Sequence, residues 1–174
     1  MEILYRISNV LQYTRPLTYV PAREIYDTGY ISKPQYALDI NSAHMSKRLS
    51  ELGVVQNKSL ILTFPHWMSD ELIPHFLRGY IDGDGCIARQ PHSYSVCFIS
   101  TLSFCESALS IVYRLTGLKA HLKESRNHNG ITTDWTISKK DDTKEFLDWI
   151  YKDAHLYLKR KHDIYLKKYV TDWN

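Results

Sequence analysis

Apolar residues recur every three or four positions just before the most distinctive turn of the chain. Over residues 69–82 they are Leu72, Ile73, Phe76, Leu77, Tyr80 and Ile81. This spacing predicts an amphipathic helix with one face in a hydrophobic core. The sequence Asp-Gly-Asp-Gly at positions 82–85 predicts that the helix ends in a tight acidic turn, because glycine is favoured just beyond helix C-termini.

The pattern downstream of this helix changes to alternation and then back to helical spacing. Alternating polar and apolar residues predict strands with one polar face, and Gly117 marks the end of a helix between two pairs of strands. The predicted order from the first helix onward is αββαββα. After that helix come two strands within residues 85–100, a helix over 103–116, strands over 118–123 and 132–137, and helices over 140–151 and 154–169.

The first 65 residues repeat the later part of this order. Their pattern predicts a helix over 2–13, strands over 17–26 and 35–41, and a helix over 43–52. The segment at 36–40 parallels the one at 133–137. We therefore predict two domains, a partial first repeat over 1–65 that lacks its motif helix and a complete repeat over 66–174.

Residues 77–85, Leu-Arg-Gly-Tyr-Ile-Asp-Gly-Asp-Gly, carry the chemistry that most narrows the function. Asp84 lies at the electronegative end of the predicted helix, where a carboxylate and nearby carbonyls can hold a hard divalent cation. Gly79 and Gly83 lie on one helix face, which lets a second helix approach closely. The motif predicts a metal site formed by paired helices. The alternative is a polar turn that only closes the helix.

This stretch resembles the signature of the LAGLIDADG homing endonuclease family. The matching positions are Leu77, Gly79, Ile81, Asp82, Asp84 and Gly85, while Arg78, Tyr80 and Gly83 are variants. The resemblance implies an α+β fold with a saddle-shaped antiparallel sheet, and site-specific, Mg²⁺-dependent cleavage of double-stranded DNA in intron homing. Family members carry two motif helices, within one chain or across a homodimer, because cleaving both strands requires an acid from each helix.

Only one such motif occurs in this chain, and three interpretations follow. The chain forms a homodimer through residues 72–83, or a separately encoded fragment supplies the missing helix. The third interpretation is a descendant that no longer cleaves. Such a protein would be a DNA-binding regulator, an intron-splicing factor, or a blocker of another nucleic-acid enzyme.

The resemblance also implies roles for individual residues. Asp84 and the carbonyl of Gly83 would hold Mg²⁺, which activates water and polarises phosphate. Lys161 and Lys58 resemble the basic residues that lie beside the active site in the two repeats, where either could stabilise charge in the transition state. For Lys161 the alternative is a solvated basic helix face. Asp82 is expected to orient the turn.

The polar strand faces are the expected contact surface for DNA, since a twisted sheet can follow a major groove and read base edges. Ordinary exposed polarity is the alternative for each residue. The candidates form two rows, the first containing Ala88, Gln90 and His92 and the second containing Lys119, His121, Lys123, Arg126, Asn127 and His128.

Composition limits these expectations. The 174 residues carry a formal net charge of +3, which is too mild to indicate nucleic-acid binding, so any basic surface must arise from clustering. Three cysteines without CxxC spacing predict core thiols, and they argue against a disulfide framework or a structural zinc site. With neither a leader pattern nor a long apolar run, we expect a soluble protein of the cytoplasm or another intracellular compartment that contains DNA.

Overall fold

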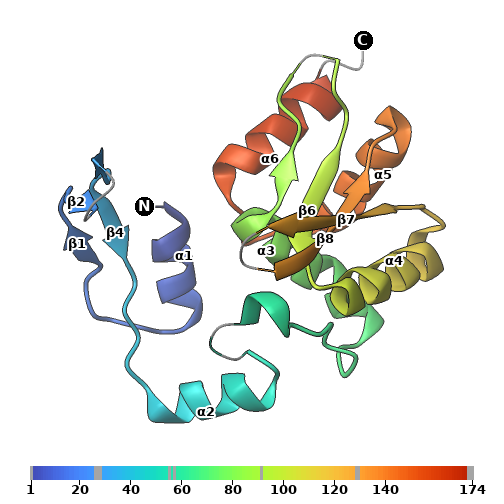
Figure 1. Ribbon diagram of the computed structural model, residues 1–174. Coiled ribbons are helices and arrows are strands. Elements are labelled where there is room, and N and C mark those ends of the chain that lie inside the picture. Colours follow the sequence, from blue (N-terminus) through green and yellow to red (C-terminus); the bar gives the residue numbers. More distant parts are fainter. Residues whose placement is uncertain are drawn as a thin grey trace. The chain divides into compact units, whose positions relative to one another are not determined.

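Figure 1 shows the computed structural model of the protein, which describes residues 2–25, 29–54, 56, 58–90, 92–127 and 130–171. The chain divides into two compact units, Met1–His44 and Met45–Asn174, and each is described by itself. Helix α2 (Ala43–Glu51) begins at the end of the first unit and lies mainly in the second.

The first unit contains one helix and two small antiparallel ladders. The Tyr13 hydroxyl donates to the Asp39 carbonyl at 2.6 Å, which ties the segment after the helix to the segment after the last strand. Ser8 is the single buried residue among those described in this unit, so the unit has little core of its own. Its elements are α1 (Glu2–Val10), β1 (Thr18–Val20) paired with β4 (Gln35–Ala37), and β2 (Glu24–Ile25) paired with β3 (Tyr30–Ile31).

The second unit has the predicted element order. Three-residue 3-10 turns η1 (Lys58–Leu60) and η2 (Asp70–Leu72) precede the first long helix. The elements that follow are α3 (Ile73–Asp84), β5 (Cys86–Ile87), β6 (Val96–Ser100), α4 (Leu102–Thr116), β7 (His121–Asn127), β8 (Gly130–Ile137), α5 (Lys140–Tyr151), α6 (Lys159–Tyr165) and the π-helical turn η3 (Leu166–Thr171).

The last predicted helix begins later than residue 154. Asp153 adopts a left-handed backbone conformation with φ of 54°, which interrupts helical geometry directly after α5. The chain therefore crosses residues 152–158 without helix and starts α6 at Lys159. This irregular segment supplies backbone groups that hold the end of α3, as described below.

The four strands form one antiparallel sheet in the order β5-β6-β8-β7. Figure 1 shows helices α3, α4, α5 and α6 around these strands, and α3, α4 and α6 contact strands of the sheet directly. Burial alternates along β8, where Trp135 and Ile137 are buried and the residues between are less so. Trp135 stacks on Phe98 of β6 with ring centroids 4.9 Å apart. The sheet therefore has one face in the hydrophobic core and one open face.

Helix α4 begins and ends where the sequence predicts. The Thr101 hydroxyl oxygen accepts a hydrogen bond from the Phe104 amide at 3.1 Å and thereby caps the first turn. Gly117 takes a left-handed conformation with φ of 76°, which ends the helix. Glycine adopts this conformation readily because it has no side chain. Among the described residues, no helix combines the length and apolar character that crossing a bilayer requires.

Candidate functional site

Helix α3 presents one face that its own unit leaves uncovered. Gly79 and Gly83 are exposed, and the space where a side chain would extend from either is open. Asp84, the last residue of the helix, is also exposed. The chain thus provides a helix face without side chains that leads to a solvent-accessible carboxylate.

Gly85 makes the abrupt turn from α3 into the sheet possible. A Cβ atom at this position would lie 2.7 Å from the Ile81 Cα and 2.9 Å from the Cys97 carbonyl oxygen. These are backbone atoms that cannot move aside, so a larger residue would push the helix end away from β6. The absence of a side chain at Gly85 is what places Asp84 beside the sheet.

Lys161 caps the end of α3 from inside the unit. The residue is buried, and its ammonium group donates to the carbonyls of Ile81, Asp82 at 3.0 Å and Gly85 at 2.6 Å. An ammonium group has three protons, so these carbonyls use all of them. Burial lowers the pKa of Lys161. The structure thus contradicts the alternative of a solvated basic helix face for Lys161 and shows a buried ammonium group bonded to three carbonyls.

Asp82 holds the same helix end through its side chain. Its carboxylate accepts from the Leu158 amide at 2.8 Å and from the Tyr151 hydroxyl at 3.1 Å. Burial raises the pKa of Asp82, although these hydrogen bonds and nearby cations act in the opposite direction. Asp82 therefore joins α3 to α5 and to the segment that precedes α6.

Arg78 is a structural cation that the sequence analysis treated only as a variant of the motif. Its guanidinium donates to the Ile150 carbonyl at 2.7 Å and the Leu156 carbonyl at 3.0 Å, and it lies 2.9 Å from His75 Nδ1. It is buried, and burial lowers its pKa. In the sequence, Arg78 directly follows the apolar Leu77 and precedes the apolar Tyr80 and Ile81. This position within an apolar stretch could have indicated that the arginine is buried.

Asp84 and Lys58 line the same cavity. This cavity has a volume of about 250 Å³, and its other lining residues include Tyr80, Ser100 and Thr132. The Tyr80 hydroxyl donates to the Ser100 hydroxyl at 3.0 Å. The structure therefore brings together two of the three predicted catalytic residues, an acid and a base, and leaves Lys161 to cap the helix.

The open face of the sheet carries a mixture of polar groups set by the strand register. Lys123 of β7 lies opposite Asp134 of β8, which lies opposite Ile99 of β6. These side chains offer hydrogen-bond donors, acceptors and methyl groups, the features that read base edges. The residues that share this face are Cys86, Cys97, Ile99, His121, Lys123, Ser125, Thr132, Asp134 and Thr136.

Two residues of the predicted second row, His121 and Lys123, lie on this open face and are exposed. Arg126 does not share it, because it pairs with Ile131 and strand alternation directs it to the opposite side. Lys119 precedes β7, and its ammonium lies 5.9 Å from the Tyr113 ring on α4.

The remaining candidates differ in where the structure places them. Ala88 is buried, so its side chain cannot contact DNA, and this corrects its assignment to the first row. Gln90 and His92 are exposed. Asn127 ends β7 opposite Gly130, whereas His128 lies outside the described residues.

The donor set for a metal ion is small. Among the described residues, no group of three or more His, Cys, Asp or Glu side chains could hold a metal. Magnesium, however, is commonly bound by one or two carboxylates together with water and substrate phosphates. Lys161 occupies the carbonyls of Ile81, Asp82 and Gly85 and none of its bonds goes to Gly83. The Asp84 carboxylate and the Gly83 carbonyl are therefore the groups here that could contribute ligands to Mg²⁺.

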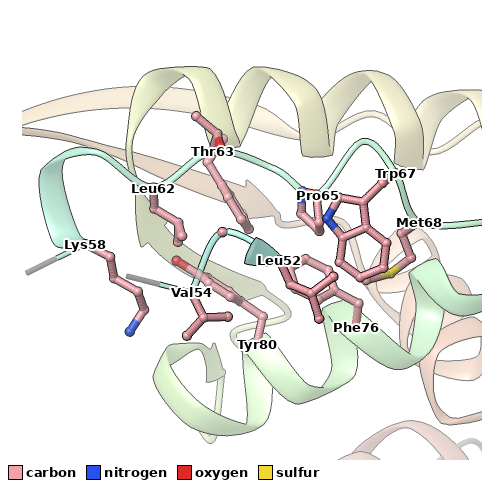
Figure 2. A pocket seen from close by; sticks show the side chains of 12 residues that line it. Leu52, Val54, Lys58, Leu62, Thr63, Pro65, Trp67, Met68, Phe76 and Tyr80 are labelled. Atoms are coloured by element: carbon pink, nitrogen blue, oxygen red, sulfur yellow. The ribbon is translucent and has the colours of Figure 1, made fainter. Parts of the chain in front are cut away.

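An apolar cavity of about 250 Å³ lies beside this helix face. Figure 2 shows Phe76 and Tyr80 of α3 pointing toward Leu52, Leu62 and Trp67 on the segment before the helix. Trp67 remains 58% exposed, which is unusual for so large an apolar side chain. The Phe76 and Tyr80 side of α3 thus borders an apolar cavity.

Comparison with known proteins defines the class. Residues 71–151 match the family model described as the LAGLIDADG-like domain. This segment, from the start of α3 to the end of α5, is therefore a LAGLIDADG-like domain, and the resemblance of the motif at residues 77–85 is confirmed. No curated protein sequence matches the chain.

Solved structures add the fold. The N-terminal LAGLIDADG domain of DUF199/WhiA is 16% identical, with a TM-score of 0.50 over 93% of this chain and 71% of that one. The homing endonuclease I-TnaI is 17% identical, with a TM-score of 0.37 over 52% of this chain and 65% of its own. I-CvuI, solved with a DNA target in the presence of Mg, is 14% identical, with a TM-score of 0.38 over 56% and 64%. The α+β LAGLIDADG fold is confirmed.

Proposed function

We propose that the protein is a site-specific, Mg²⁺-dependent endonuclease for double-stranded DNA, with an active site that a second motif helix completes. The observation that carries this proposal is the exposed Asp84 at the end of the glycine face of α3. Arg78, Asp82 and Lys161 all hold this helix end in place, so the exposed carboxylate is presented rigidly. Rigid presentation is what a catalytic carboxylate needs.

The open helix face supports pairing with a second motif helix. Helices whose contacts are glycines can approach closely, and a Cβ atom added at Gly79 or Gly83 would meet nothing within 4 Å outside the helix's own backbone. The second helix would come from another copy of the chain or from a separately encoded fragment. Either arrangement brings a second carboxylate to the Mg²⁺ half-site of Asp84 and Gly83.

The open sheet face supports contact with DNA. His121 and Lys123 supply charge and hydrogen bonds there, while Thr132 and Thr136 add hydroxyl and methyl groups. Phosphate contacts fix the register of a protein on the duplex, and base contacts specify the sequence. A face that contains both kinds of group suits site-specific recognition.

We assign the role of the catalytic basic residue to Lys58 rather than to Lys161. Bound Mg²⁺ would polarise the scissile phosphate and lower the pKa of an attacking water. Lys58 faces the cavity next to Asp84, where a cation can stabilise the charge that develops on the phosphate. We expect Lys58→Met to slow cleavage about 100-fold, the loss typical of one electrostatic donor.

A second candidate function is nucleic-acid binding without cleavage. The position of Lys161 favours this second function. Its three protons are all donated to backbone carbonyls, so Lys58 is the basic residue that shares the cavity with Asp84. A binding protein of this kind would act as a regulator, a splicing factor or a blocker of another nucleic-acid enzyme.

A cleavage assay with Asp84→Asn separates the two functions. The substrate is DNA from the host locus in the allele that lacks the intron or intein, with Mg²⁺ or with chelator. We expect wild type to cut only with Mg²⁺, and Asp84→Asn to bind with unchanged affinity and not to cut. Glu106→Gln, which removes one charge from an exposed position on α4, is the matched control and should cut normally. Tight binding without cleavage by wild type would replace the endonuclease with the second candidate.

A further inference from the structure

Two cysteines face each other on the open side of the sheet. Cys86 of β5 and Cys97 of β6 are direct antiparallel partners. The Ala88 amide donates to the Ser95 carbonyl at 2.9 Å, and hydrogen-bonded pairs alternate along a ladder, so Cys86 and Cys97 form the next such pair. Hydrogen-bonded pairs have Cα atoms about 5.5 Å apart. That separation lies within the range found in disulfides, about 4.4–6.8 Å. The Cβ atoms of a hydrogen-bonded pair lie about 5.5 Å apart, so closing the bridge requires the two strands to move together by about 1 Å.

The third cysteine has a different environment. Cys105 is buried in α4, and its thiol donates to the Thr133 carbonyl at 3.3 Å. Burial raises its pKa to about 11 and closes it off from solvent. Burial also raises the pKa of Cys97. Cys86 is exposed and Cys97 is half-buried, so reagents in solution can reach the pair. The sequence-based expectation of three core thiols is correct for Cys105 and wrong for Cys86.

We propose that Cys86 and Cys97 are a redox modification site that closes to a reversible disulfide by exchange with a small-molecule disulfide of the glutathione type. The exposed Cys86, as thiolate, attacks one sulfur of that disulfide and releases one small thiol. Cys97, as thiolate, then displaces the second small thiol from Cys86. The two protein thiols are oxidised and give up two protons, and the small disulfide is reduced to two thiols.

The loop that joins the two strands is held in place by a lysine. The Lys168 ammonium donates to the carbonyls of Ala88, Gln90 and Ser93 in the loop that joins the two strands. A bridge formed at this pair would carry strain, and strained disulfides are more easily reduced, which suits a reversible site. Because only Gly85 separates Cys86 from Asp84, the bridge would also fix the chain next to the exposed carboxylate.

The experiment uses the full chain, first reduced and then equilibrated with oxidised glutathione. We expect an intact mass lower by two hydrogen atoms, protection of both residues from alkylation, a Cys86–Cys97 peptide link, and full reversal by dithiothreitol. The midpoint of thermal unfolding should rise by several degrees in the oxidised form, because the bridge restricts the unfolded chain.

Three variants make the assignment specific. Cys105→Ser should form the same bridge as wild type, while Cys86→Ser and Cys97→Ser should show no loss of two hydrogen atoms. A bridge that involves Cys105, a lasting glutathione adduct at Cys86 beside a free Cys97, or a dithiol that stays reduced in excess oxidised glutathione would each overturn the proposal. None of these measurements requires DNA, so their outcome is independent of the endonuclease proposal.

Discussion

The two faces of helix α3 differ in whether their charged residues are buried and hydrogen-bonded or exposed to solvent. On one face, Arg78 and Asp82 are buried and hydrogen-bonded to α5 and to the segment that precedes α6. On the other face, Gly79 borders open space and Asp84 is exposed. Two aspartates in one motif therefore have opposite roles, because Asp82 anchors the helix end and Asp84 remains available to a ligand. Because both residues are aspartates, the difference in burial is what separates their roles.

The same contrast divides the two lysines. Lys161 lies on the anchored side of the helix end, where its ammonium donates to backbone carbonyls. Lys58 lines the cavity on the open side together with Asp84. The comparison predicts that mutations on the anchored face change stability, whereas mutations on the open face change association and binding.

The largest effect is expected from Lys161→Met, which removes the donor from three carbonyls at a buried helix end. An unsatisfied buried polar group destabilises a fold by about 1–3 kcal/mol, so we expect a loss of about 3 kcal/mol in the free energy of unfolding. Urea denaturation measures it. The control is Lys159→Met on the same helix, where loss of an exposed ion pair with Asp163 should change stability by less than about 1 kcal/mol. Equal losses in the two variants would contradict a buried cap.

Gly83→Leu tests the open face. The fold should tolerate it, since open space surrounds that position and leucine favours helix more than glycine does. Association through the helix face should weaken at least tenfold in sedimentation experiments, because the side chain separates the two helices. Gly85→Ala is the counterpart, and we expect it to destabilise the unit because its Cβ would meet backbone at 2.7 Å. A wild-type chain that stays monomeric with and without DNA would exclude the homodimer.

Asp82→Asn should produce a smaller effect that depends on pH. The folded protein raises the pKa of Asp82 above its ordinary value of 3.8, so the protonated form favours the fold. Its contribution to stability is complete below pH 3.8 and declines as pH rises through the folded pKa. The asparagine variant lacks this decline, and so wild type should lose stability relative to it over that range. Parallel urea midpoints at every pH would contradict the burial of this carboxylate.

Lys123→Ala should give the smallest effect, in the salt dependence of DNA binding. Each phosphate contact contributes about 0.9 to the slope of log K against log salt, so losing one should reduce the slope by about that amount. Arg126→Ala should leave it unchanged, since strand register puts Arg126 on the opposite face of the sheet. Titrations at several salt concentrations measure these slopes. A reduced slope for Arg126→Ala alone would place DNA on the other side of the hairpin.

Much of the secondary structure follows from local pattern. The 3.6-residue spacing located α3, and alternating residues located β7 and β8. The predicted start of the last helix at residue 154 was wrong. The left-handed conformation of Asp153 interrupts helical geometry after α5, and α6 begins only at Lys159. Local pattern also failed for side-chain direction in the DNA-binding rows, because the register put Arg126 on the opposite face and burial removed Ala88.

The sequence by itself determined the motif helix, its acidic end and the resemblance to the LAGLIDADG signature, because these depend on residues close together in the chain. Only the tertiary structure decided what the charged residues do. Lys161 and Arg78 donate to carbonyls more than 70 positions away in the chain. The pairing of Cys86 with Cys97 likewise depends on strand register. Long-range hydrogen bonds and strand register form only when separate elements pack together. The local spacing of apolar residues in the sequence does not indicate which elements will pack.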